Sequence, residues 1–186
     1  MALITISDRR GRKMDITYKT TKDNVNWEEV RDVLQRVGMT DLSVEEQRLV
    51  FERSSNVVFA YDKDKIIGVS RALSDGFYQA VIYNVALDKE YRGHGIGREL
   101  IMRLVDQLKG QNIILYTHPR NVSMYEKFGF RRAKTAMVIF DKSEHDRQWR
   151  EASGFLMPEG YRFIDEYDRE DMKRGRTLLE TSGKKK

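Results

Sequence analysis

The sequence contains no cysteine among its 186 residues. A chain without cysteine forms no disulfide, holds no metal through thiolates and has no cysteine nucleophile. Its three histidines, His94, His118 and His145, lack the spacing of a zinc site. The sequence also has no apolar run approaching the ~20 residues of a membrane helix, and its N-terminal apolar stretch is too short for a signal peptide. We therefore expect no metal, no membrane partner and a cytoplasmic location, with the nucleus as the alternative.

Charged residues, by contrast, are abundant, at 34% against 40% hydrophobic residues. This balance is typical of a globular domain with a polar surface. The net charge of +5 suits polyanionic ligands, but many soluble proteins carry as much. The length fits one domain with an additional C-terminal segment better than two independent cores.

The hydrophobic pattern predicts an alternation of strands and helices in an α/β fold. Asn26 is the expected N-cap of the first helix, and Ser43 with Glu46 has the pattern of a capping box before the second. Strands are expected over residues 14–19, 57–62, 65–73, 77–88, 113–117 (short and buried) and 136–141, and helices over 27–37, 45–54, 98–108 and 122–128.

Residues 90–100 read EYRGHGIGREL, which places three glycines directly before a predicted helix. Glycine allows close backbone approach to a ligand and positive φ, and a helix N-terminus offers unpaired N–H groups with a partial positive charge. Together they favour a phosphorylated ligand. The spacing fits neither G-x-G-x-x-G nor a P-loop, but it does fit R-x-x-G-x-G through Arg92, Gly95 and Gly97. The alternative is that these glycines only relieve a tight corner between a strand and a helix.

Two segments resemble motifs of the GNAT superfamily, the acyl-CoA-dependent N-acyltransferases. VALDKEYRGHGIGRELIMRL resembles motif A, and YEKFGF (Tyr125–Phe130) resembles the end of motif B. The resemblance extends from about Met14 to Asp141. It implies a GNAT-like α/β domain over residues 1–141, with a mixed, mostly antiparallel central sheet and helices on both faces, followed by a C-terminal extension over residues 142–186.

The resemblance also implies that acetyl-CoA is the co-substrate. Backbone groups of residues 85–87 would bind the pantetheine as an added strand, and N–H groups of residues 92–98 would hold the pyrophosphate. The family often has an asparagine seven residues before the motif B tyrosine; here that residue is His118, while Asn121 lies four before it. Either side chain could contact the cofactor, or His118 could be an ordinary polar loop residue. The expected cofactor-binding residues are therefore Val85, Ala86, Leu87, Arg92, Gly93, His94, Gly95, Ile96, Gly97, Arg98, His118 and Asn121.

Because cysteine is absent, an acyl-cysteine intermediate is excluded, and an amine must attack the thioester directly. The resemblance implies that Tyr125 protonates the departing sulfur; the alternative is an ordinary half-buried core tyrosine. The general base is not identified, although Tyr83 and Asn84 could position a water and His118 has a suitable pKa. We also expect Gly95→Val to weaken CoA binding while leaving the fold intact.

These features predict an N-acetyltransferase whose acceptor is a small-molecule amine. The alternatives are a protein lysine or N-terminus as acceptor, or a non-catalytic CoA-binding module. A homodimer is an open possibility, and nucleic acid is not an expected partner because the sequence lacks its recognition motifs.

The extension has too many aromatic residues for a free tail. We expect it to fold back onto the domain or a second subunit up to about residue 179, with residues 184–186 disordered. Its apolar residues are Trp149, Phe155, Leu156, Met157, Tyr161, Phe163 and Tyr167.

Overall fold

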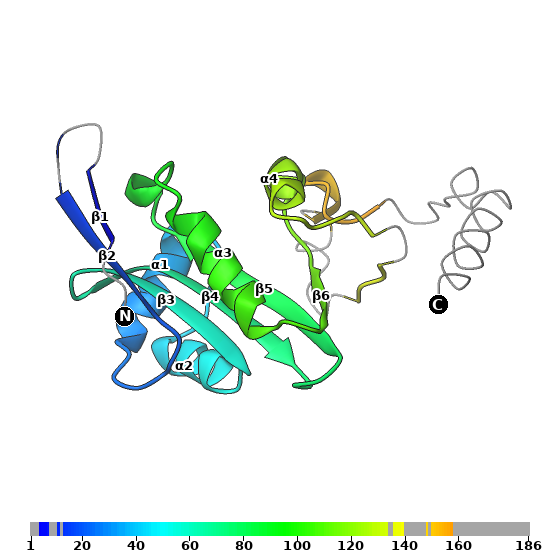
Figure 1. The fold of residues 1–186 in the computed structure, drawn as a ribbon. Helices are drawn as coiled ribbons and strands as arrows, with labels where there is room; N and C mark the ends of the chain where they lie inside the picture. The colour runs from blue at the N-terminus through cyan, green and yellow to red at the C-terminus, as the bar shows by residue number, and fades with distance from the viewer. Residues whose placement is uncertain are drawn as a thin grey trace, which may run out of the picture. The chain divides into compact units, whose positions relative to one another are not determined.

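The computed structural model describes residues 4–7, 11, 13–133, 136–139, 148 and 150–157. These residues include a six-stranded sheet whose strands follow the order of the sequence (Figure 1). The neighbouring strands are antiparallel except for β5 and β6, which are parallel. The strands are β1 Ile4–Ser7, β2 Lys13–Lys19, β3 Asn56–Asp62, β4 Lys65–Ser74, β5 Gln79–Leu87 and β6 Asn112–Leu115.

Helices lie on both faces of this sheet (Figure 1). In β3, Val58 and Ala60 belong to the core that α3 covers, whereas Val57 and Phe59 belong to the core under α1 and α2. This alternation follows from the two-residue period of a strand. The expected mixed, mostly antiparallel sheet with helices on both faces is confirmed. The helices are α1 Trp27–Arg36, α2 Val44–Glu52, α3 Ile96–Gln107 and α4 Val122–Lys127, with 3₁₀ turns η1 Lys89–Tyr91 and η2 Pro119–Asn121.

The two predicted helix caps are present. The Asn26 side chain accepts hydrogen bonds from the backbone N–H groups of Glu28 (3.1 Å) and Glu29 (3.3 Å). The Ser43 hydroxyl accepts from the Glu46 N–H at 3.3 Å, and the Glu46 carboxylate accepts from the Ser43 N–H at 2.8 Å. Such local contacts decide where a helix begins, which is why the sequence predicted them.

The structure corrects the sequence prediction at three strands. β1 was not predicted, and it pairs with β2 over four residues. β6 was expected to be buried, but Ile114 is 51% exposed, because among the described residues β6 pairs only with β5 and forms a sheet edge. The strand expected over 136–141 is absent from its described part, Ala136–Ile139, where the side chains of Met137 (96%) and Ile139 (97%) are exposed.

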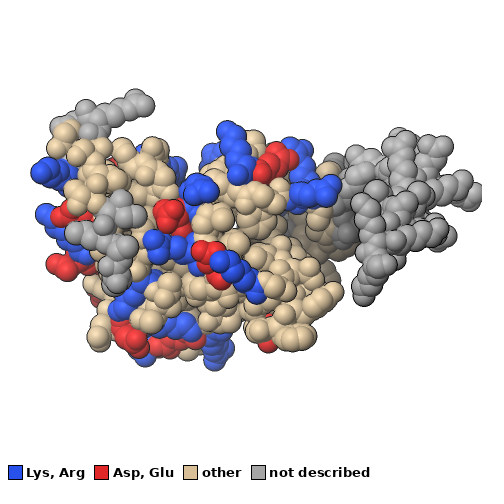
Figure 2. Space-filling view, in the orientation of Figure 1, with Lys and Arg blue, Asp and Glu red and all other residues tan. Residues whose placement is uncertain are grey.

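The chain divides into two compact units, Met1–Thr117 with Val122–Arg132, and His118–Asn121 with Ala133–Lys186. The first unit contains the sheet, and the domain boundary at residue 141 stays a prediction. None of the described helices is long and apolar enough to cross a bilayer. Over the face shown in Figure 2, Lys and Arg side chains are interspersed with Asp and Glu.

Candidate cofactor and acceptor site

The glycine turn, residues 92–98, connects the end of η1 to α3. Gly93 (φ +85°) and Gly95 (φ +81°) are both in the left-handed region that other residues rarely adopt. A Cβ added at either position would meet nothing within 4 Å, so the space over the turn is open. The glycines therefore both shape the corner and leave room for a ligand. A β-branched residue is strained at this φ, so Gly95→Val should cost stability, and the expectation that it leaves the fold intact stays a prediction.

The N-terminus of α3 has no side-chain cap, unlike those of α1 and α2. Its N-cap is Gly95, whose carbonyl accepts the first helical hydrogen bond from the Glu99 N–H at 3.1 Å. The N–H groups of the first turn are left without a side-chain acceptor, and the helix dipole adds a partial positive charge there. An anion such as a pyrophosphate fits this position.

Side chains of the turn point in several directions. Arg92 donates from Nε and Nη2 to the Leu87 carbonyl, both at 3.3 Å, and so turns back toward the end of β5. Arg98 lies 4.0 Å from the Glu99 carboxylate. Ile96 is 2% exposed and anchors the turn in the core. Arg92 is thus bound by the chain itself, whereas the Arg98 side chain is 59% exposed beside the backbone groups of the turn.

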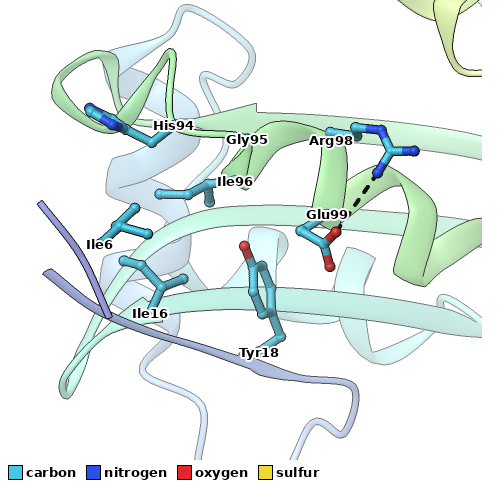
Figure 3. A pocket seen from close by; sticks show the side chains of 8 residues that line it. All are labelled: Ile6, Ile16, Tyr18, His94, Gly95, Ile96, Arg98 and Glu99. Atoms are coloured by element: carbon cyan, nitrogen blue, oxygen red, sulfur yellow. Dashed lines mark ion pairs between the residues drawn. The ribbon is translucent and has the colours of Figure 1, made fainter. Parts of the chain in front are cut away.

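A cavity of about 240 Å³ adjoins the turn on its side toward β1 and β2 (Figure 3). Tyr18 points its hydroxyl toward the first turn of α3, and burial, together with the charge of Glu99, raises the pKa of Tyr18 to about 12. The Glu99 carboxylate would repel an anion placed inside the cavity. We therefore expect the pyrophosphate on the open side of Gly93 and Gly95. The cavity is lined by Ile6, Ile16, Tyr18, His94, Gly95, Ile96, Arg98 and Glu99.

One edge of β5 is only partly paired. Parallel pairing with β6 covers Gln79–Ile82, while beyond Ile82 the described residues pair β5 with β4 alone. The pairing with β4 shifts register near Asn84, a residue with φ +48°. The open edge therefore includes the expected pantetheine-binding residues 85–87. An extended amide-bearing ligand can add to such an edge as a further strand.

Tyr125, on α4, is 8% exposed. Its ring makes edge contacts with Phe128 (6.3 Å between centroids) and Phe130 (5.7 Å). Burial raises the pKa of Tyr125 above its ordinary value, while a side-chain hydrogen bond with Thr117 lowers it by less. The residue thus has the packing of a core tyrosine and a hydroxyl that stays protonated at neutral pH. Its catalytic role stays a prediction.

His118 and Asn121 belong to the second compact unit. The Arg120 N–H donates to His118 Nδ1 at 3.2 Å, and the Asn121 N–H donates to the His118 carbonyl at 2.8 Å. The His118 ring also contacts Phe155, with centroids 5.4 Å apart. These contacts favour the loop interpretation of His118, and cofactor binding by either residue stays a prediction.

Arg71, which no sequence motif indicated, lies opposite Tyr83 in the pairing of β4 with β5. Its Nε donates to the Asn84 side-chain oxygen at 2.6 Å, so that amide orients an arginine. An arginine in an alternating strand ordinarily faces solvent, and only the pairing register shows its neighbours. Among the described residues, no group of three or more His, Cys, Asp or Glu could hold a metal ion.

A sequence model described as the acetyltransferase (GNAT) family matches residues 23–130. The chain belongs to the GNAT family of acetyltransferases. The matched range contains the glycine turn, the open edge of β5 and Tyr125. The resemblance drawn from the two motifs is thereby confirmed.

This GNAT acetyltransferase has relatives of moderate similarity. It is 28% identical over 120 residues to the uncharacterized N-acetyltransferase ycf52 of Pyropia yezoensis, a match that covers 61% of this chain and 69% of that relative. It is 34% identical over 109 residues to serotonin N-acetyltransferase 2, chloroplastic, of Oryza sativa subsp. japonica, covering 54% of each. A solved acetyltransferase of the GNAT family from Streptococcus pneumoniae TIGR4 is 26% identical, with a TM-score of 0.60 over 69% of this chain and 99% of that one.

Proposed function

We propose that this GNAT acetyltransferase transfers the acetyl group of acetyl-CoA directly to the amine of a small molecule. The observation that carries the proposal is the uncapped N-terminus of α3, at Gly95, close in sequence to the open edge of β5. The edge suits the amides of pantetheine, and the N–H groups of the turn suit a pyrophosphate. The residues present fit both ends of one co-substrate.

The transfer needs few side chains. The amine nitrogen attacks the thioester carbonyl carbon, the C–S bond breaks, the nitrogen loses a proton and the sulfur gains one. A backbone N–H of residues 85–87, with Leu87 as our choice, would polarise the carbonyl. The Asn84 side-chain oxygen accepts a hydrogen bond from Arg71, and the positioning of a water by Asn84 stays a prediction.

Tyr125 would supply the proton to the departing sulfur. Its raised pKa keeps the phenol protonated throughout the neutral range. The ordinary pKa of a phenol is about 1.5 units above that of a thiol. Full transfer of the proton from the phenol to the thiolate therefore costs about 2 kcal/mol. The burial of Tyr125 increases that cost, which favours a hydrogen bond to the developing thiolate with the proton moving late.

A small acceptor is supported by the rice relative, which carries the name of an enzyme for serotonin, a small amine, over 54% of each chain. A second candidate is a polypeptide acceptor. It is favoured by exposed apolar side chains on β4 and β6, where Leu73 is 44% and Ile114 is 51% exposed. An extended peptide could lie along this part of the sheet.

The test is an acetyl-CoA assay that measures free thiol across polyamines, arylalkylamines, aminoglycosides, amino acids and histone peptides. Turnover of a small amine supports the proposal, and turnover of peptides alone favours the second candidate, a polypeptide acceptor. CoA binding by calorimetry without turnover of any amine would indicate a non-catalytic module. A chain that binds no CoA at all contradicts the cofactor assignment.

A further inference from the structure

Arg71 is a half-buried cation in the middle of β4. It lies on the sheet face covered by α2, with its guanidinium 6.0 Å from the centre of the Phe51 ring and 4.9 Å from that of Tyr83. Stacking on tyrosine holds the guanidinium plane in place and is favourable for a cation. The side chain is therefore positioned rather than free in solvent.

The polar partners of Arg71 are neutral. Nε donates to Asn84 at 2.6 Å and Nη1 to the Ser54 hydroxyl at 3.3 Å, whereas Nη2 has no acceptor among the described residues. No described carboxylate forms an ion pair with it, while Arg36, for comparison, pairs with Asp88 at 2.8 Å. Burial lowers the pKa of Arg71, which reflects the cost of its charge in this environment. An incoming anion would offset that cost and use the remaining N–H groups.

Arg71 lies close to the expected site of acyl transfer. Its partner in the register is Tyr83, and Val85 follows two residues later, after Asn84 with its positive φ. Two residues of an extended strand span about 7 Å, and the left-handed backbone at Asn84 brings Tyr83 and Val85 closer together than that. A single small molecule is long enough to place an anionic group at Arg71 and an amine beside the open edge of β5.

Apart from Asn84 and Ser54, the surroundings of Arg71 are aromatic and apolar. The Tyr116 ring meets that of Tyr83 edge-on at 6.1 Å between centroids. Leu73 pairs with Val81, which in turn pairs with Ile114, so these three share one face of the sheet. Leu73 and Ile114 are both exposed. An acceptor bound here would meet one cation beside aromatic and apolar side chains.

We propose that Arg71 binds a carboxylate of the acceptor, so that the acceptor is an amino-acid-like amine with an apolar or aromatic side chain. This inference rests on the proposed acetyltransferase function. A planar guanidinium matches a carboxylate through two parallel hydrogen bonds, which an ammonium group cannot reproduce. Arg71 is accordingly a specificity residue with no proton to transfer.

The experiment compares phenylalanine, phenylalaninamide and phenethylamine as acceptors for the wild type, Arg71→Met, Arg71→Lys and Arg48→Met. Arg71→Met is expected to lower kcat/KM for phenylalanine by roughly 10- to 100-fold, the size of a lost charged hydrogen bond. Its kcat/KM for phenethylamine should change by less than about threefold. Arg71→Lys should keep part of the preference for phenylalanine over phenethylamine, because lysine keeps the positive charge. Comparing substrates across variants cancels the different basicities of the three amines.

Arg48→Met is the matched control, because Arg48 is an exposed arginine on α2 that pairs with Glu52 at 2.8 Å. The inference is overturned, with acetyltransferase activity intact, if Arg71→Met keeps the wild-type ratio of phenylalanine to phenethylamine. If no amine is acetylated, calorimetry can still measure whether the protein binds 3-phenylpropionate, a carboxylate without an amine, and so test the carboxylate site independently of activity. Binding that is lost in Arg71→Met and kept in Arg48→Met supports the carboxylate site, and absence of binding to the wild type overturns it.

Discussion

At the scale of single residues, Tyr125 is where a structural and a catalytic role can be separated. We expect Tyr125→Phe to lower kcat by roughly 10²-fold with little change in CoA affinity, because the ring packing is kept and only the proton is lost. Burial raises the pKa of Tyr125 above its ordinary value, and an acid works below its pKa. Any alkaline limb of kcat due to this group should therefore lie at higher pH than the pKa of an exposed tyrosine would place it. It should be missing in the Phe variant, as kcat measured against pH would reveal.

The opposite outcome has a distinct signature. A purely structural Tyr125, held by Thr117 and two phenylalanine rings, would on mutation lose thermal stability and keep its turnover per folded molecule. Circular dichroism melts alongside the kinetics distinguish the two. Unchanged kcat with an unchanged pH profile would leave water as the proton donor.

Gly95 permits a similar separation. Asparagine tolerates positive φ better than other residues with a side chain, so Gly95→Asn should largely keep the fold while filling the open space over the turn. We expect its CoA affinity, measured by calorimetry, to fall at least tenfold. Gly38→Asn is the control, because Gly38 also has a positive φ (+72°) with nothing within 4 Å of an added Cβ, and it lies outside the glycine turn, after α1. Equal CoA affinity in both variants would show that the pyrophosphate does not bind at this turn.

At the scale of secondary-structure elements, Gly68 decides how closely α3 lies against β4. A Cβ at this position would lie 2.8 Å from Leu100 Cδ1 and 3.0 Å from the Ala86 carbonyl oxygen, and a backbone atom cannot rotate away. We expect Gly68→Ala to destabilise the fold by about 1–3 kcal/mol, as overpacking does. Urea denaturation measures this, and a midpoint equal to that of the wild type would show that the helix shifts freely.

The same distinction between local and non-local contacts explains how far the sequence could be interpreted. α1 and α2 and their caps at Asn26 and Ser43 were predictable because the deciding atoms lie within four residues. The glycine turn was predictable for the same reason. The exposure of Ile114 and the surroundings of Arg71 depend on which strands are neighbours, and no spacing along the chain encodes that.

At the scale of the whole molecule, the C-terminal extension awaits a test. Phe155 packs on His118 within the second unit, whereas the aromatic residues Trp149, Tyr161, Phe163 and Tyr167 lie outside the described residues. We expect truncation after Asp141 to lower the melting temperature or change the oligomeric state, because buried aromatic area is lost. Light scattering on a sizing column, with a melt of the same sample, measures both. A truncated chain that matches the full chain in both would show that the extension neither packs on the domain nor joins subunits.

The order of the strands in the sheet also has a kinetic consequence. Short loops connect β1 to β2, and β3 to β4 to β5, so these two groups of strands should each assemble early, whereas β2 meets β3 only across the segment that contains α1 and α2. β6 joins only after the chain has passed through α3, and it does so through four residue pairs at an edge. We expect the amides of β6 to exchange with deuterium through a partial opening, well before those of β3 and β4, which should exchange only on global unfolding. Uniform protection across all six strands would show instead that the sheet opens as a single cooperative unit.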